Sequence, residues 1–166
     1  HEVVVLMDSA YGDKDILRLL HGRGWDFVCA LKSNRSTQTS TPLQGDGYKR
    51  KWQSVKELFW ATRKQAPWET IRDHCFGKKR KSKRKEFRAR RLVGYLKLLP
   101  FKIALVCSEK SKRKGRIHLA CSNTEVSTRA IVLAYRRRWW VELFHRAIKN
   151  NLGLQDAGVV GFDSLV

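Results

Sequence analysis

Residues 135–149 read YRRRWWVELFHRAIK, and they hold four functional groups at helical spacing: Tyr135, Arg138, Glu142 and Lys149. The steps between these residues are three, four and seven, and an α-helix turns by about 100° per residue. Side chains at such steps share one face, so the segment predicts a helix with a carboxylate between two cations. Such a face suits the binding of phosphate together with metal. The alternative is a solvated charged face, the usual role of a run of charges.

A second informative stretch is VVVLMDSAYGD, residues 3–13. The apolar residues 3–7 predict a buried parallel strand that leads directly into Asp8. A helix over about 13–22 and a strand over 25–31 complete a predicted βαβ unit. Asp8 then stands at the carboxyl end of its strand, where open α/β sheets place active sites. The alternative is an aspartate that only caps a turn or a helix.

The rest of the chain predicts a mixture of loops, strands and helices. Residues 35–50 are polar and predict a loop, and 52–64 predict a short helix. Two apolar runs, 101–108 and 115–122, predict a hairpin. A long helix is predicted over about 128–150, with Ser127 or Thr128 as its N-cap and Gly153 as a stop signal.

Positive charge is the dominant feature of the composition, with a formal net charge of +20. Residues 35–123 carry 25 Lys and Arg against 6 Asp and Glu, a net +19, which leaves +1 for the rest of the chain. A polyanion is therefore the expected partner. A membrane surface is a weaker alternative, because no amphipathic anchor is evident. No apolar run approaches the roughly 20 residues that span a bilayer.

The densest charge lies in residues 78–91, KKRKSKRKEFRARR, which hold ten cations and one acid. Such a segment cannot bury itself, and it predicts a loop that is mobile or ordered by DNA. The alternatives are a tract similar to a nuclear-import signal and one that only increases solubility.

The four cysteines form no CxxC pair, and three of them, Cys29, Cys107 and Cys121, lie in apolar, strand-like runs. Cys75 is the fourth. This pattern favours reduced, buried thiols over zinc ligands or disulfides.

The spacing in residues 135–149 is that of the Tyr-Arg-Glu-Lys signature of DDE-type insertion-sequence transposases, and this chain resembles that family. The stretch VVVLMDSAYGD is similar to the segment that carries the family's second aspartate. The resemblance implies an α/β, RNase H-like catalytic core in residues 1–34 and 124–166. A basic, β-containing insertion, residues 35–123, interrupts this core.

The resemblance also implies roles for individual residues. Asp8 would be the second catalytic aspartate and Glu142 the glutamate, and together they would hold Mg²⁺ (or Mn²⁺). Asp13 and Asp15 are rival candidates, but only Asp8 directly follows the apolar strand. Contacts to DNA are expected from Tyr135, Arg138, Trp139 and Lys149 and from the basic run, namely Lys78, Lys79, Arg80, Lys81, Lys83, Arg84 and Lys85.

The expected function is metal-dependent DNA strand cleavage and strand transfer at transposon ends. The partners would be transposon-end and target DNA, the working form a homodimer on paired ends, and the location the nucleoid in a prokaryotic cytoplasm. The alternatives are a non-catalytic nucleic-acid-binding fragment and an RNase H-like nuclease without strand transfer. No residue matches the family's first aspartate, so the chain is expected to be a fragment, incomplete at both ends and inactive alone.

Overall fold

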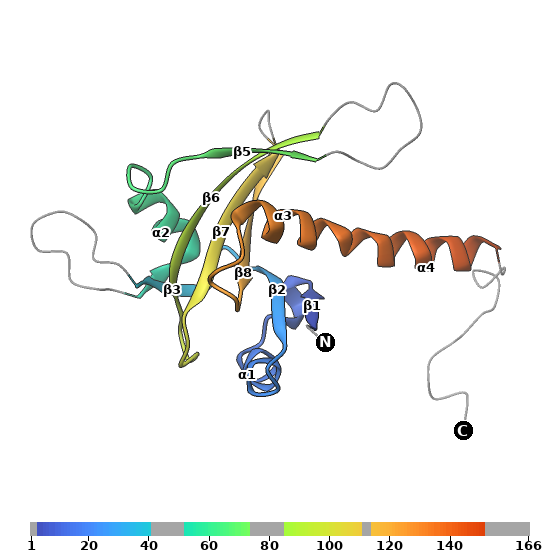
Figure 1. The fold of residues 1–166 in the computed structure, drawn as a ribbon, viewed down its shortest axis with the longest axis horizontal. Helices are drawn as coiled ribbons and strands as arrows, with labels where there is room; N and C mark the ends of the chain where they lie inside the picture. The colour runs from blue at the N-terminus through green and yellow to red at the C-terminus, as the bar shows by residue number, and fades with distance from the viewer. Residues whose placement is uncertain (1–2, 41–51, 74–84, 111–113, 152–166) are drawn as a thin grey trace, which may run out of the picture. The chain divides into compact units, whose positions relative to one another are not determined.

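The computed structural model describes residues 3–40, 52–73, 85–110 and 114–151 (Figure 1). The chain divides into two compact units, His1–Tyr135 and Arg136–Val166. The first unit contains an eight-stranded sheet with its covering helices, and the second contains the C-terminal helix.

The N-terminal part of the first unit is the predicted βαβ unit. Strand β1 (Val4–Met7) pairs in parallel with β2 (Asp26–Leu31), and helix α1 (Lys14–Gly22) connects them. The helix ends in a turn, where Gly24 has a φ of +68°, a conformation that glycine adopts without strain. The βαβ prediction is therefore confirmed.

Strand β1 is less buried than its apolar sequence predicts. Met7 is buried, whereas Val3 is 39% and Val4 51% exposed. The reason is its place at one end of the sheet, where β2 is its only partner among the described strands. The expectation of a buried strand is therefore wrong for the first half of β1.

The remaining strands extend the sheet from β2 in the order β1-β2-β8-β7-β6-β3-β4, and β5 also pairs with β6. Apart from the β1–β2 pair, all these pairings are antiparallel. The predicted hairpin is present as β7 and β8. The elements are β3 (Ser36–Thr39), β4 (Gln53–Ser54), α2 (Val55–Ala61), β5 (Glu69–Asp73), β6 (Lys85–Leu96), β7 (Ile103–Lys110) and β8 (Lys114–Cys121).

Two segments that were predicted as loops contain strands. Within 35–50, residues 36–39 form β3, because Thr37 and Thr39 turn inward and are buried while the strand pairs with β6. Within 78–91, residues 85–91 belong to β6, which is held between β5 and β7. Both segments contain strands because neighbouring strands hydrogen-bond to their backbones. The pattern of polar and charged residues alone does not reveal such pairing. Residues 41–51 and 78–84 lie outside the described residues.

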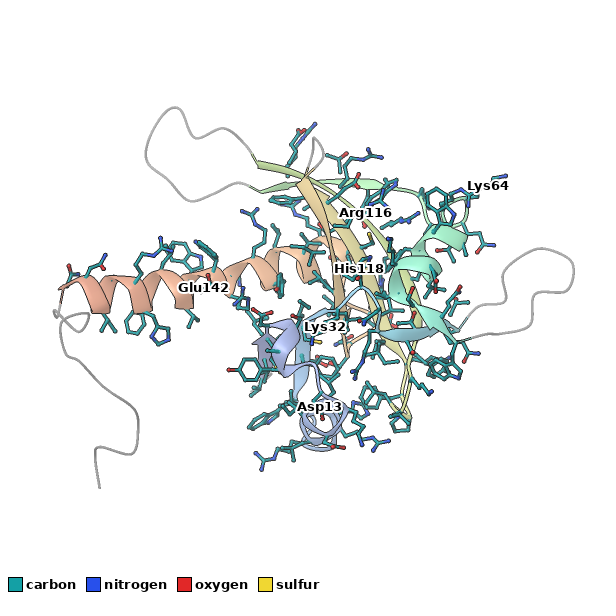
Figure 2. The ribbon with its side chains drawn as sticks, turned by 180° about the vertical axis from the view of Figure 1, so that it is seen from behind. Asp13, Lys32, Lys64, Arg116, His118 and Glu142 are labelled. Carbon is teal, nitrogen blue, oxygen red and sulfur yellow. The ribbon has the colours of Figure 1, made fainter. Side chains whose placement is uncertain are left out.

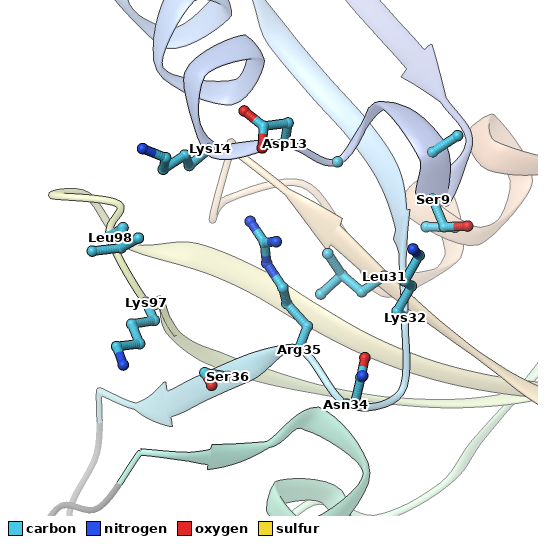
Figure 3. A pocket seen from close by; sticks show the side chains of 13 residues that line it. Ser9, Asp13, Lys14, Leu31, Lys32, Asn34, Arg35, Ser36, Lys97 and Leu98 are labelled. Atoms are coloured by element: carbon cyan, nitrogen blue, oxygen red, sulfur yellow. The ribbon is translucent and has the colours of Figure 1, made fainter.

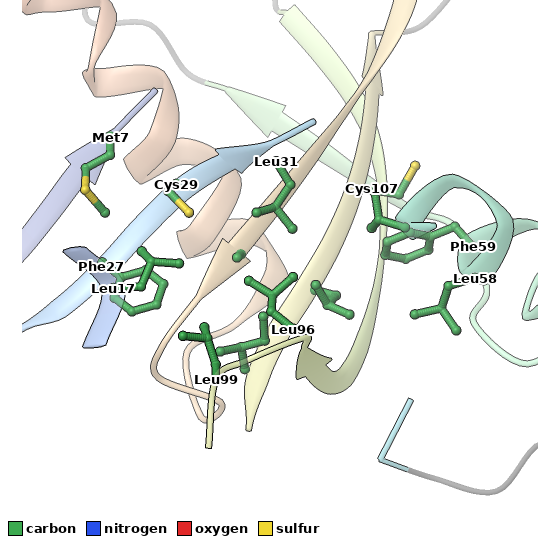
Figure 4. Close-up of a cluster of buried hydrophobic side chains, with 14 of the residues drawn as sticks. Met7, Leu17, Phe27, Cys29, Leu31, Leu58, Phe59, Leu96, Leu99 and Cys107 are labelled. Atoms are coloured by element: carbon green, nitrogen blue, oxygen red, sulfur yellow. The ribbon is translucent and has the colours of Figure 1, made fainter. Parts of the chain in front are cut away.

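The sheet has a core on each face, because neighbouring residues of a strand point to opposite sides. Cys29 and Leu31 of β2 join the first core, with residues of α1 and α2 such as Leu17 and Phe59 (Figure 4). Val28 and Ala30 of the same strand join the second core, together with Ile131 and Val132 of α3 (Thr128–Arg137). Helices therefore cover both faces of the sheet.

The predicted helix over 128–150 is divided in two. Helix α3 ends at Arg137, and α4 (Trp139–Asn151) begins after a turn at Arg138. At this turn the Val141 N–H donates to the carbonyl of Arg138 (3.1 Å), a tighter i to i+3 bond than the α-helical one. Ser127 is the N-cap, since its hydroxyl accepts from the Ala130 N–H (3.2 Å). Gly153 lies outside the described residues.

This mixed α/β architecture agrees with the expected RNase H-like fold, and the basic middle segment does contain strands. Strand β2, from the predicted core, and β8, from the predicted insertion, are direct neighbours in one sheet. The division into a core (1–34 and 124–166) and an insertion (35–123) stays a prediction. None of the described helices is long and apolar enough to cross a membrane.

Candidate active site

Asp8 stands where the sequence predicts, directly after β1 at its carboxyl end. Its side chain accepts a hydrogen bond from the Ser9 N–H and caps a short 3₁₀ helix, Ser9–Tyr11. The Tyr11 N–H also donates to the Asp8 carbonyl (3.1 Å). The capping role that was the alternative is therefore real. It is compatible with a second role, because an ionised carboxylate has several acceptor positions.

The two rival aspartates have other structural roles. Asp13 is the N-cap of α1, and its side chain accepts from the Asp15 N–H (2.8 Å). Asp15 is in the first turn of the helix, where its side chain is 70% exposed and pairs with Lys14 (3.7 Å) and Arg18 (3.9 Å). Both are accounted for by the start of α1, which leaves Asp8 as the aspartate at the end of the strand.

Glu142 lies in the first turn of α4, within the second unit (Figure 2). Its carboxylate forms an ion pair with the Nη1 of Arg138 at 2.7 Å, and the two side chains are 38% and 24% exposed. A carboxylate at a helix N-terminus also interacts favourably with the helix dipole. The structure thus brings together two of the four residues of the Tyr-Arg-Glu-Lys spacing.

The other residues of the spacing lie on the same two helices. Tyr135 is in α3, in the first unit, and packs partly buried against the second core. Trp139, the first residue of α4, is 50% exposed, and Lys149 is near the end of α4. Asp8 belongs to the first unit and Glu142 to the second, so a metal ion shared by the two carboxylates stays a prediction.

Of the basic run, Lys85 begins strand β6. The remaining predicted DNA contacts of the run lie outside the described residues, namely Lys78, Lys79, Arg80, Lys81, Lys83 and Arg84.

A group of arginines around Trp68 is a feature that the sequence did not predict. The guanidinium carbons of Arg88, Arg90 and Arg116 lie 5.1, 4.9 and 5.8 Å from the centre of the Trp68 ring. Arg90 is only 2% exposed, donates to the Phe59 carbonyl, and has a lowered pKa because burial disfavours its charge. Strand β6 pairs with β5 and, like β8, with β7, and these pairings bring the group together. Only correct strand registers would have revealed it.

The described cysteines behave as predicted buried thiols. Cys29, Cys107 and Cys121 are free and buried. Burial raises the pKa of Cys29 to about 12 and also raises the pKa of the other two. Thiols that stay protonated are poor nucleophiles and poor metal ligands. Within the described residues, no three His, Cys, Asp or Glu side chains gather to hold a metal ion.

Comparison with known proteins gives one finding about the whole chain. A family model described as the transposase DDE domain matches residues 1–166. A search of curated proteins gives no match.

Proposed function

The chain belongs to the transposase DDE domain family, and from this premise we propose that it cleaves and joins DNA strands at transposon ends. The observation that carries the proposal is the family match over residues 1–166, which includes the strand-end Asp8 and the helical Glu142. The net charge of +20 also favours a polyanionic substrate.

The reaction begins with hydrolysis of the donor strand at the transposon end. Water attacks the phosphorus, the P–O3′ bond breaks, and the leaving oxygen takes up a proton to become a free 3′-hydroxyl. That hydroxyl then attacks a phosphodiester of the target DNA, and the displaced target oxygen leaves with a proton. No covalent bond to the protein forms, so the side chains act by orienting phosphates and by balancing charge.

The chemistry of the two carboxylates fits a hard divalent cation, which takes oxygen ligands. Asp8 and Glu142 are the residues that we propose would hold Mg²⁺ or Mn²⁺. When bound, such ions neutralise the charge that develops on the phosphate and activate the attacking oxygen. In this chain Glu142 is paired with Arg138. If Glu142 held a metal ion, the Arg138 guanidinium could exchange the carboxylate for a DNA phosphate.

The second part of the task is to hold the DNA end, and cationic side chains suit it. We propose that Arg138 and Lys149 contact phosphates of the transposon end, as an arginine fork and a lysine ammonium do in general. The Tyr135 hydroxyl would add a hydrogen bond, and the exposed Trp139 ring would stack on a distorted DNA end. A homodimer on paired ends and work at a prokaryotic nucleoid belong to the same proposal.

A strand-cleavage assay tests the proposal. The probes are labelled duplexes that carry the genomic sequence on either side of the gene, with shuffled duplexes of equal length as controls. We expect selective binding of the flanking DNA and metal-dependent release of a 3′-hydroxyl end. Cutting by residues 1–166 should be weak, because the resemblance assigns only Asp8 and Glu142 of three carboxylates. A chain preceded by an aspartate-bearing strand should cut well.

The variants Glu142→Gln and Asp8→Asn, made in the longer chain that cuts well, identify the carboxylates involved. Each keeps the shape of its side chain and removes the charge, so each should abolish cutting and preserve DNA binding. Asp15→Asn is the matched control and should cut normally. Loss of cutting in the control but not in the other two would overturn the assignment. Cutting of flanking and shuffled DNA alike, without strand joining, would favour the nuclease alternative.

A further inference from the structure

A pocket of about 510 Å³ in the first unit has a wall that begins one residue after Asp8 (Figure 3). Its described lining comes from three segments: residues 9–14, which end at the start of α1; residues 30–36, from the end of β2 to the start of β3; and residues 97–98, in the turn after β6. Each segment contributes cationic residues to the lining, namely Lys14, then Lys32 and Arg35, then Lys97. These four residues define what we call the four-cation pocket.

The charge of the four-cation pocket is unbalanced. Among the described residues of its lining, Asp13 is the acidic one, and its side chain is occupied in capping α1. Lys14 is partly neutralised by Asp15 at 3.7 Å. Within the described part of the chain, no carboxylate lies within ion-pair distance of Lys32, Arg35 or Lys97. Several cations around one hollow with so little compensation favour an anionic ligand.

The backbone that carries these cations is held in place. The Arg35 N–H donates to the Lys32 carbonyl (3.0 Å), and the Arg35 carbonyl accepts from the Val55 N–H (2.9 Å). The Lys97 N–H donates to the carbonyl of Ser36 (3.0 Å), which connects two of the three segments. The cations therefore project from fixed backbone positions, which lowers the entropic cost of binding a ligand.

The third segment is fixed in a costly conformation. Leu98 has a φ of +73°, in the left-handed region that a leucine rarely occupies. Its carbonyl accepts from the guanidinium of Arg18 in α1, which ties the β6–β7 turn to that helix. Strained backbone of this kind persists where surrounding contacts hold it, often beside binding sites. Here it keeps Lys97 at the rim of the four-cation pocket.

The side chain of Arg35 gives the pocket a specific anchor. It is partly buried and points into the hollow, while Lys97 and Lys14 lie at the edges (Figure 3). An arginine fork offers two parallel donors that match the oxygens of a phosphate. Asn34, Ser9 and Ser36 add neutral polar groups, and Ala30 and Leu31 supply an apolar wall for a sugar.

We propose that the four-cation pocket binds a backbone phosphate of the DNA strand close to the bond that is cut. This inference rests on the proposed function, which identifies the ligand as DNA. The pocket is placed close to the cut bond because its lining residue Ser9 directly follows Asp8. The pocket fixes the strand by its phosphate, so it contributes affinity and register without reading sequence.

The test is the salt dependence of binding to a random duplex by the full chain. The pocket variant is Lys32→Ala with Arg35→Ala, and the matched control is Lys64→Ala with Arg129→Ala, two exposed cations outside the pocket. We expect the pocket variant to bind roughly tenfold more weakly and to lose about one unit of the slope of log K against log salt per lost contact. The control should lose less of both. Equal losses in the two variants would overturn the proposal.

Two further variants guard against a folding artefact. Lys97→Ala changes an exposed turn residue and leaves no cavity in the core. A smaller slope of log K against log salt in this variant therefore reports on the pocket itself. Arg35→Lys keeps the charge and loses the fork, so it should keep the slope but lower the affinity. If Lys97→Ala keeps the wild-type slope and affinity, the pocket does not contact the backbone.

Calorimetric titration with inorganic phosphate and pyrophosphate shows whether the pocket binds a DNA backbone phosphate or a small phosphate-containing ligand. Millimolar or weaker binding of these ions, lost in the pocket variant along with DNA affinity, agrees with a backbone subsite. Tight pyrophosphate binding with unchanged DNA affinity would assign the pocket to a small ligand and overturn the proposal. A chain preceded by an aspartate-bearing strand that binds random duplex through the pocket but never cuts flanking DNA would refute the proposed function alone.

Discussion

The Arg138 guanidinium and the Glu142 carboxylate form an ion pair of 2.7 Å, one helical turn apart in the second unit. The pair links the two requirements of the proposed reaction, since the carboxylate is needed for a metal ion and the guanidinium for a phosphate. Both side chains are partly exposed, so the pair itself contributes little to stability, about 0.3–0.5 kcal/mol for an i, i+4 pair. In the proposed reaction, the pair would matter for what each partner binds once it opens.

Replacing Arg138 by Ala should therefore strengthen metal binding and weaken DNA binding. The carboxylate of Glu142 no longer has a competing cation, while one phosphate contact is lost. Mn²⁺ titration followed by electron paramagnetic resonance measures the first effect, and a filter-binding assay the second. Arg137→Ala, an exposed arginine one position away, is the matched control and should leave Mn²⁺ affinity unchanged. Weaker Mn²⁺ binding in Arg138→Ala would contradict the competition.

DNA affinity of the whole chain should fall steeply with salt, because residues 35–123 carry a net +19. If about six phosphates are contacted, the binding constant should drop by roughly 10³-fold between 50 and 200 mM salt. Neutralising residues 78–84 should weaken binding to all duplex sequences alike, because backbone contacts carry no sequence information. Fluorescence anisotropy over a salt series measures both effects. A salt-independent affinity would refute the phosphate-dominated interface.

Gly94→Ala should destabilise the first unit. A Cβ at Gly94 would lie 2.3 Å from the backbone oxygen of Gln38, in the adjacent strand β3. The backbone has to shift, and overpacking of this kind costs about 1–3 kcal/mol. The control is Gly22→Ala at the end of α1, where an added Cβ meets nothing within 4 Å. This substitution should raise the free energy of unfolding by about 0.4–1 kcal/mol. Urea denaturation measures both, and equal midpoints for the two variants would contradict the close approach.

Stability should fall as the pH drops below about 6.5, in part because of His118. Burial, and then the nearby charges of Arg116 and Arg90, lower the pKa of His118 below its ordinary 6.5. In acid the unfolded chain therefore takes up a proton that the folded chain does not, so the free energy of unfolding decreases between pH 6.5 and the lower folded-state pKa. The stabilising effect of the neutral ring is complete above this window.

The variant His118→Gln removes this titration, so its loss of stability between pH 7.5 and 5.5 should be smaller than that of the unchanged chain. His145→Gln, at an exposed position of α4, is the control and should keep the full loss. Urea denaturation at the two pH values provides the comparison. An unchanged loss in His118→Gln would show that the acid sensitivity arises elsewhere.

Local sequence patterns are sufficient to predict those elements that are recognisable from their own segment of the sequence. The βαβ unit and the β7–β8 hairpin follow from apolar runs and turn residues, and Asp8 follows from its place after β1. What the sequence could not supply was partnership between distant segments. The sequence of β3 predicts a loop, and only its pairing with β6 makes it a strand. The sequence of β1 predicts a buried strand, but its position at the end of the sheet leaves its first residue, Val4, half exposed.

The same reason explains the unpredicted parts of the site. The four-cation pocket and the arginines around Trp68 each combine segments that lie far apart in the chain. The ion pair of Arg138 and Glu142, by contrast, follows from local helical spacing. The sharing of metal by Asp8 and Glu142 stays a prediction of the family resemblance.

The pairing of β2 with β8 has a consequence for how the chain folds. The Phe27 N–H donates to the Ser122 hydroxyl across 95 positions of sequence, and this contact joins the N-terminal strands to the rest of the sheet. Closing so long a loop has a high entropic cost and is therefore slow. The consecutive strands β6, β7 and β8 are joined by short connections, so their pairing is faster. The antiparallel strands should therefore assemble first and serve as the template on which β2, and then β1, are added last.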